Sequence, residues 1–329
     1  MANWDHTTDV LVVGSGGGAM TAALTAKQAG LDVLMIEKTE YYGGSTALSG
    51  GGLWIPNNYL LQRDGLDDSL EKARTYLKNT VGDRTPQALQ DAYLENAPEM
   101  VKYLSSNSHV RFHRSVGYAD YYPERPGGTA DGRAIEGSPF DGSKLGADFK
   151  QLRPMSIKIP AGLAFTASEY NKIGMITSTW AGKWVALKVG VRTFFNMLTG
   201  VKLLALGQAL VARLRLSLKD EGVPIWLNTP FKELVVEYGA VVGVVAEKDG
   251  KPFRIRASKG VILAAGGFDH NQQMREEFQQ APVNHEWSSG SPGNTGDAIQ
   301  AGVKIGAKID LMEDAWGGPS TVPANMPVM

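Results

Sequence analysis

The feature that most constrains this chain is a glycine-rich turn between a short apolar segment and a helix of small residues near the N-terminus. Residues 9–13 predict a strand, and residues 19–29 predict a helix. Between them, Gly14, Gly16 and Ala19 have the spacing Gly-x-Gly-x-x-Ala. The first turn of a helix offers unpaired N–H groups and the positive end of the peptide dipoles. The arrangement therefore predicts a phosphate-binding turn.

An acidic residue follows this turn at the distance that a dinucleotide site requires. A second predicted strand, residues 32–36, ends in Glu37, about 20 residues after Gly14. A carboxylate at this place accepts a hydrogen bond from a free ribose hydroxyl and repels a 2′-phosphate. The pattern favours FAD or NAD over NADP, and these residues alone do not decide between the two.

Composition places the chain among ordinary globular proteins. It has 329 residues, 43% hydrophobic and 20% charged, and a formal net charge of −1. A chain of this length usually divides into two lobes, and near-neutral charge argues against a nucleic-acid partner. Because there is no cysteine, disulfides, a thiolate nucleophile, an iron–sulfur centre and a cysteinyl flavin link are excluded. None of the five histidines has metal-ligand spacing, so we expect no metal site.

Two further patterns concern location. The first residues lack the basic start and apolar run of a signal peptide, which together with the missing cysteines favours a cytoplasmic protein. No stretch approaches ~18 uncharged apolar residues, so we expect no membrane span. Residues 185–206 are apolar but include Lys188, Arg192 and Lys202. We interpret them as a buried or surface amphipathic helix in preference to a helix that contacts a membrane.

Apolar spacing along the rest of the chain indicates an α/β fold. Asp249-Gly250 predicts a hairpin, and the apolar run that ends at Gly266 predicts a central parallel strand with a ligand at its carboxyl end. This order is typical of a dinucleotide-binding sheet with an inserted β-meander. The expected helices are residues 69–80, 86–105 and 203–221, and the expected strands are residues 225–227, 231–238, 241–247, 253–257 and 261–265.

A second glycine-rich segment covers residues 43–52. Glycine, serine and threonine make up most of it, so backbone N–H groups and hydroxyls dominate. A long polar ligand laid along it would find many donors and little steric hindrance. Residues 54–56, Trp-Ile-Pro, are expected to anchor the segment, and we therefore favour a ligand cradle over a flexible linker.

These segments together resemble a known flavoprotein family. They are similar to those of the FAD-dependent 3-ketosteroid Δ1-dehydrogenases, within the superfamily of fumarate reductase and succinate dehydrogenase flavoproteins. Residues 120–123, Asp-Tyr-Tyr-Pro, point to the steroid branch. The other segments that carry the resemblance are residues 14–19, 37–38, 43–56, 264–271, 294–297 and 314–316.

The resemblance implies an α/β fold with a Rossmann-like FAD-binding domain and an α+β substrate or cap lobe. The implied division is residues 1–110 and 203–318 for the FAD-binding domain with its β-meander, 111–202 for the cap lobe, and 319–329 for an irregular tail. FAD is expected to be held without a covalent link, because residues 44–52 contain no histidine. The implied FAD-binding residues are Gly14, Ser15, Gly16, Gly17, Ala19, Glu37, Lys38, Gly44, Ser45, Thr46, Ser49, Gly50, Gly51, Gly52, Ala265, Gly266, Asn294, Gly296 and Asp297.

The implied reaction, within steroid degradation, introduces a 1,2 double bond into a 3-ketosteroid. C2 loses a proton, and C1 gives a hydride to flavin N5. Tyr122 is the implied member of the catalytic phenol network, Tyr121 is expected to pack, and the role of Tyr118 stays open. Arg125 and Arg133 could bind an anion, but solvated loop charge is the favoured interpretation. The implied partners are an apolar, steroid-like ketone and an electron acceptor.

Two alternatives stay open. One is a fumarate reductase-like flavoprotein that acts on another substrate, and the other is an inactive, truncated FAD-binding module. Family members extend well past residue 329, so we expect this chain to be an amino-terminal portion. Further catalytic residues would then lie outside it.

Overall fold

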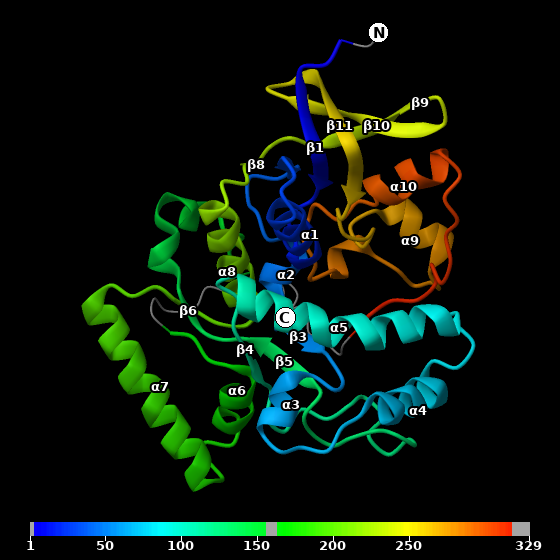
Figure 1. Ribbon diagram of the computed structural model, residues 1–329. Coiled ribbons are helices and arrows are strands. Elements are labelled where there is room, and N and C mark those ends of the chain that lie inside the picture. Colours follow the sequence, from blue (N-terminus) through cyan, green and yellow to red (C-terminus); the bar gives the residue numbers. More distant parts are fainter. Residues whose placement is uncertain (1–2, 156–162, 318–329) are drawn as a thin grey trace. The chain divides into compact units, whose positions relative to one another are not determined.

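The computed structural model describes residues 3–155 and 163–317 (Figure 1). The described residues form two compact units. The first comprises those within Met1–Leu48, Ala147–Lys158 and Leu214–Met329, and the second those within Ser49–Gly146 and Ile159–Arg213. These bounds differ from the expected division into 1–110, 111–202 and 203–318, which stays a prediction about domains. The expected tail at 319–329 lies outside the described residues.

The first unit is built on a six-stranded sheet in the order β8-β2-β1-β11-β10-β9. β1 is parallel to both β2 and β11, and β2 is parallel to β8, whereas β9 and β10 form the antiparallel edge. The expected α/β class is confirmed, and the meander extends the same sheet. The strands are β1 (His6–Val13), β2 (Val33–Ile36), β8 (Ile225–Trp226), β9 (Phe231–Glu237), β10 (Ala240–Lys248) and β11 (Lys251–Leu263).

One strand replaces the two that were expected at residues 253–257 and 261–265. β11 pairs with β10 through its first half and with β1 through its second half. The polar residues between the two apolar runs coincide with a register shift against β1, where the Ser258 hydroxyl donates to the Asp9 carboxylate at 2.7 Å. The expected hairpin is confirmed, because Lys248 and Lys251 pair across Asp249-Gly250, whose two φ angles are positive.

Small residues position the first helix of this unit. Ala19, Met20, Ala23 and Leu24 form the buried side of α1, and the alanines let the helix approach β1 closely. The predicted open segment at residues 43–52 instead contains one short helix, α2. The helices of this unit are α1 (Gly17–Gln28), α2 (Gly44–Leu48), α9 (Gln272–Phe278), α10 (Asp297–Lys304) and the 3₁₀ helix η2 (His285–Trp287). Helix α8 (Leu206–Asp220) and the 3₁₀ helix η1 (Gly142–Gln151) contain residues of both units.

The second unit contains two small sheets and five helices in its described part. The sheets have the orders β3-β5-β4 and β6-β7. The helices expected at residues 69–80 and 86–105 are confirmed as α4 and α5. The strands are β3 (Gly52–Trp54), β4 (Phe112–Arg114), β5 (Ala134–Gly137), β6 (Phe140–Asp141) and β7 (Leu203–Leu204), and the helices are α3 (Tyr59–Arg63), α4 (Leu70–Thr80), α5 (Gln87–Asn107), α6 (Ala167–Ile173) and α7 (Trp180–Thr199).

The apolar stretch at residues 185–206 is not one helix. α7 ends at Thr199, and Gly200, which caps it, has the left-handed φ of 71° that favours glycine. β7 and the first residue of α8 follow. Within the described ranges, none of the helices has the length and apolar character that crossing a bilayer would require.

Candidate functional site

The turn between β1 and α1 requires glycine at its first position. Gly14 has a φ of +110°, and a Cβ atom built on it would lie 2.2 Å from the carbonyl oxygen of Ala264 at the end of β11. The helix begins after Gly16, which offers no side chain as a cap, and its first turn contains no acidic residue. The positive end of α1 therefore faces the space after β1 without a carboxylate of its own, as a phosphate site requires.

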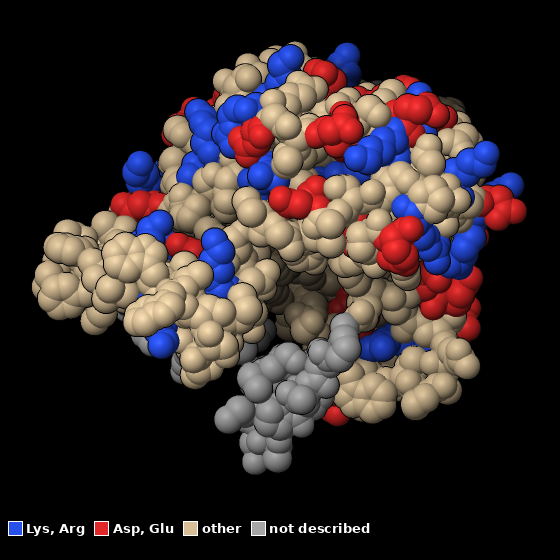
Figure 2. All heavy atoms as spheres, turned by 90° about the horizontal axis from the view of Figure 1, so that it is seen from below, with Lys and Arg blue, Asp and Glu red and all other residues tan. Residues whose placement is uncertain are grey.

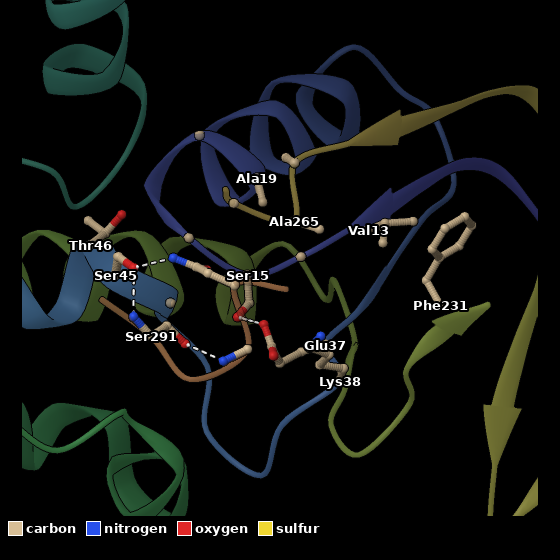
Figure 3. A pocket seen from close by; sticks show the side chains of 18 of the residues that line it. Val13, Ser15, Ala19, Glu37, Lys38, Ser45, Thr46, Phe231, Ala265 and Ser291 are labelled. Atoms are coloured by element: carbon tan, nitrogen blue, oxygen red, sulfur yellow. Dashed lines mark hydrogen bonds between the residues drawn. The ribbon is translucent and has the colours of Figure 1, made fainter. Parts of the chain in front are cut away.

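Glu37 is held in one orientation beside this turn (Figure 3). Its side chain is mostly buried directly after β2. The Ser15 hydroxyl donates to one carboxylate oxygen at 2.5 Å, and the Thr39 amide and hydroxyl donate to the other at 2.9 and 2.8 Å. The Ser15 hydroxyl also accepts from the Gly43 amide at 3.1 Å. The turn, the acid and the second glycine segment are thus joined by one hydroxyl.

A cluster of side chains from α2 and the loop before α10 lies next to Ser15. The Ser45 hydroxyl accepts hydrogen bonds from the Ser291 amide and from the Asn294 side-chain amide, both at 2.9 Å (Figure 3). Thr46 accepts from the Gly17 amide at 3.0 Å. A Cβ atom on Gly266 would lie 2.4 Å from the Asn294 side-chain oxygen, so this glycine is what lets Asn294 approach.

Lys38 and Asp297 form an ion pair at the same place, with 2.7 Å between the ammonium nitrogen and a carboxylate oxygen. Thr295 accepts a hydrogen bond from Lys38 and donates one to Asp297. Burial raises the pKa of Asp297, but the hydrogen bonds from Lys38 and Thr295 outweigh burial and leave this pKa below its ordinary value. The carboxylate therefore stays charged at neutral pH.

These groups surround a cavity of about 380 Å³ within the first unit. This volume is in the range of small-molecule sites. The expected FAD-binding residues that line it are Gly14, Ser15, Gly16, Gly17, Ala19, Glu37, Lys38, Gly44, Ser45, Thr46, Ala265, Gly266, Asn294 and Asp297.

Five expected residues do not line this cavity. Gly296, with a φ of +76°, caps the start of α10 and packs close to Met274. Ser49, Gly50, Gly51 and Gly52 belong to the second unit, where Gly51 approaches the start of α8. Their contact with a flavin stays a prediction.

Some lining residues were not anticipated. Phe231 is the first residue of β9 and Thr229 lies just before it, where the sequence shows only a strand pattern. Ser291 and Gly293 precede the expected Asn294. The amide of Thr229 donates to the Glu37 carbonyl at 2.9 Å, which brings β9 to the site. The remaining ones adjoin expected residues, so proximity in sequence could have found them: Val13, Gly18, Ile36, Ala264 and Gly267.

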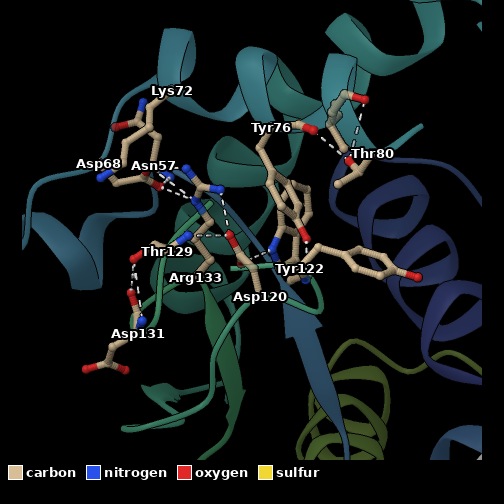
Figure 4. A network of polar contacts seen from close by, with 12 residues as sticks. Asn57, Asp68, Lys72, Tyr76, Thr80, Asp120, Tyr122, Thr129, Asp131 and Arg133 are labelled. Atoms are coloured by element: carbon tan, nitrogen blue, oxygen red, sulfur yellow. Dashed lines mark hydrogen bonds and ion pairs between the residues drawn. The ribbon is translucent and has the colours of Figure 1, made fainter. Parts of the chain in front are cut away.

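A buried ion-pair network lies in the second unit (Figure 4). The Arg133 guanidinium donates to the Asp120 carboxylate at 2.8 Å and to Asp68 at 2.8 Å. All three side chains are almost completely buried. Trp54 donates from its indole nitrogen to Asp120 at 2.7 Å. The interpretation of Arg133 as solvated loop charge is therefore wrong, because its guanidinium is buried and paired with both carboxylates.

The network holds the start of the tyrosine segment. The amide of Tyr122 donates to the Tyr76 hydroxyl at 3.2 Å (Figure 4). The Arg125 guanidinium lies 4.3 Å from the centre of the Tyr122 ring. The Tyr122 side chain is 48% exposed. Tyr121 is exposed as well, so the expectation that it packs is wrong. Burial and hydrogen bonding to Tyr121 raise the pKa of Tyr118, which makes Tyr118 a weaker acid than a free phenol.

Comparison with known proteins places this geometry in context. The chain is 46% identical over 320 residues to a 3-oxosteroid 1-dehydrogenase of Mycolicibacterium smegmatis, covering 96% of this chain and 56% of that protein. It is 35% identical over 303 residues to one of Comamonas testosteroni, covering 89% and 52%. The chain thus spans about half the length of the curated relatives it matches.

A solved structure is similar as well. The 3-ketosteroid Δ1-dehydrogenase of Sterolibacterium denitrificans, in complex with 1,4-androstadiene-3,17-dione, superposes with a TM-score of 0.91 at 39% identity. The match covers 98% of this chain and 59% of that one. Residues 9–327 match the FAD binding domain family. The chain belongs to this family, and the FAD expected from the sequence is confirmed as its cofactor.

Proposed function

We propose that the complete protein is an FAD-dependent oxidoreductase that introduces a 1,2 double bond into 3-ketosteroids. The observation that carries the proposal is the 46% identity to 3-oxosteroid 1-dehydrogenases across both compact units. It is supported by the likeness to a dehydrogenase solved with a steroid dienone. Because the match covers about half of these relatives, the activity belongs to the proposal for the complete protein.

The cavity of the first unit fits the adenosine diphosphate half of FAD. The N-terminus of α1 would bind the pyrophosphate, with Gly14 and Gly16 allowing close approach of the backbone. The preoriented Glu37 carboxylate would accept from a ribose hydroxyl. The Lys38–Asp297 pair would close one side without adding net charge next to the nucleotide.

The residues of the second unit suit an uncharged substrate. Bound FAD supplies an acceptor for the hydride that leaves C1 of a ketosteroid. Tyr122, held through its amide by Tyr76, would present its hydroxyl to the network that removes the C2 proton. Arg133 is occupied by Asp68 and Asp120, so it is not available to grip a dicarboxylate such as fumarate. This pairing favours a ketone over the fumarate reductase alternative.

An anaerobic titration tests the proposal. The purified complete protein should show bound flavin absorbance that a 4-ene-3-ketosteroid bleaches, with formation of the 1,4-diene. An electron acceptor should then restore the colour. Bound flavin that no ketosteroid bleaches, but that fumarate reoxidises after chemical reduction, would assign the protein to the fumarate branch. A preparation that takes up no FAD would indicate an inactive module.

A further inference from the structure

Helix α7 carries a continuous apolar stripe on the side that faces away from the rest of the second unit. Trp180 is 85% exposed, Trp184 68% and Leu198 67%. Such exposure of large apolar side chains along one helix marks an interaction surface. The other large exposed apolar residues of α7 are Leu187, Val191, Phe194, Phe195 and Met197.

Packing on the opposite side fixes which way this stripe faces. Gly182 and Val189 are the buried residues of α7. A Cβ atom on Gly182 would lie 2.7 Å from the carbonyl oxygens of Lys172 in α6 and of Met175 just after it, so no larger residue fits there. With 3.6 residues per turn, Trp184 lies about half a turn from the buried residues. The apolar stripe therefore cannot be turned inward by rotating the helix.

The charged side chains of α7 itself are all positive, and one of them, Arg192, is paired with Glu169 of α6 at 2.9 Å. Lys183 and Lys188 are exposed, and the helical period places them at the two margins of the stripe. No aspartate or glutamate occurs between Glu169 and Asp220. At the left of Figure 2, where α7 lies, the surface is mostly tan, the colour of the residues that carry no charge, with blue basic side chains between them.

We propose that α7 is a docking surface for an anionic lipid bilayer. The apolar stripe would enter the boundary between head groups and acyl chains, with Lys183 and Lys188 beside the lipid phosphates. Tryptophan and lysine together are typical of this boundary, whereas lysine is depleted from the cores of protein interfaces. The positive charge of the two lysines favours an anionic partner, and the apolar stripe favours a lipid surface over a water-soluble polyanion.

The helix would lie along the surface and would not cross it. Its three cations, Lys183, Lys188 and Arg192, interrupt the apolar run, and it does not qualify as a spanning helix. None of the residues of α7 is among those proposed for FAD binding or for catalysis. This role of α7 departs from the interpretation of residues 185–206 from the sequence, which favoured a helix that does not contact a membrane.

Vesicle co-sedimentation tests the proposal. The purified complete protein should sediment with phosphatidylcholine vesicles that contain phosphatidylglycerol, and much less with pure phosphatidylcholine. Lys183→Ser combined with Lys188→Ser should lower the partition coefficient roughly 30-fold on the anionic vesicles. Trp184→Ser combined with Phe194→Ser should lower it roughly tenfold or more on the same vesicles.

Matched variants elsewhere on the surface serve as controls. Tyr238→Asn removes an exposed aromatic side chain from the β9–β10 turn, and Lys308→Ser removes an exposed cation. Both should bind vesicles as the unaltered protein does, and circular dichroism should show all variants folded.

Three results would overturn the proposal. One is an unaltered protein that sediments with neither kind of vesicle. Another is a pair of α7 variants that bind vesicles undiminished. The third is a Trp184→Ser/Phe194→Ser protein that changes its oligomeric state or melting temperature without lipid, because the stripe would then be covered by a second copy or by another part of the complete protein.

Discussion

The two compact units hold their candidate sites by different physical means. In the first unit, steric fit of the backbone shapes the cavity, since Gly14 meets the Ala264 carbonyl where any side chain would clash. In the second unit, buried charge fixes the tyrosine segment through Arg133 and its two carboxylates. The first site should therefore tolerate a change of charge better than an added methyl group. The second should show the reverse.

The largest expected effect is that of Gly14→Val. The new side chain would meet the Ala264 carbonyl at a φ that valine does not adopt, which costs about 3 kcal/mol or more. The protein should purify without flavin absorbance and melt at a lower temperature. Gly190→Ala, outside the cavity, is the matched control, because a Cβ atom there meets nothing within 4 Å. A Gly14→Val protein that keeps its flavin would refute the steric account of the turn.

Arg133→Met should have the second largest effect. Removal of the guanidinium leaves Asp68 and Asp120 buried without their partner, which costs about 3–5 kcal/mol in the free energy of unfolding. Urea denaturation measures the loss. Arg125→Met, which removes a partly exposed guanidinium near Tyr122, should cost about 1 kcal/mol or less. Equal losses of stability in the two variants would contradict the account that buried ion pairs hold the second site.

Tyr122→Phe tests the catalytic proposal with little change of structure. Loss of the hydroxyl should lower kcat of the complete protein about 100-fold, as is typical when a proton-transfer group is removed. The amide contact to Tyr76 does not depend on the hydroxyl, so the flavin spectrum should be unchanged. Tyr121→Phe is the control and should retain most of the turnover. Unchanged turnover in Tyr122→Phe would take this residue out of the catalytic network.

A change of charge at the first site should have a moderate effect. Glu37→Gln keeps the shape but removes the negative charge and one of the two acceptor oxygens, so that either Ser15 or Thr39 loses its acceptor, and the Kd for FAD should rise about tenfold. Fluorescence titration of the apoprotein measures this. Glu40→Gln, a neighbouring exposed carboxylate, should leave the Kd unchanged. A loss as severe as that of Gly14→Val would contradict the comparison between the units.

The smallest effect concerns pH. The pKa of Asp297 in the folded protein lies below its ordinary value, so its ionisation contributes stability that is present above about pH 4 and is lost as the pH falls through the folded pKa. Melting temperatures between about pH 3 and 6 should therefore fall less steeply at the acid end for Asp297→Asn. Asp83→Asn, at an exposed position, should follow the unaltered protein. Identical profiles for all three would show that the Lys38 pair adds nothing to stability.

The sequence predicted the first site better than the second. The turn at Gly14 and the acid at Glu37 are local requirements of a βαβ unit, and both are visible as a motif. Thr229 and Phe231 reach the cavity only because β8 and β9 return to the same sheet, which no short pattern encodes. Arg133 was misjudged because its partners lie 13 and 65 residues away, and their pairing depends on the packing of β5 against distant loops.

The central claim is that the cavity of the first unit binds the adenosine diphosphate half of FAD. Competition between cofactor fragments tests it most directly. We expect the apoprotein to bind FAD, ADP to compete with FAD for the site, and FMN, which lacks the adenosine half, to bind far more weakly. FMN that binds as tightly as FAD, or ADP that fails to compete, would contradict the account.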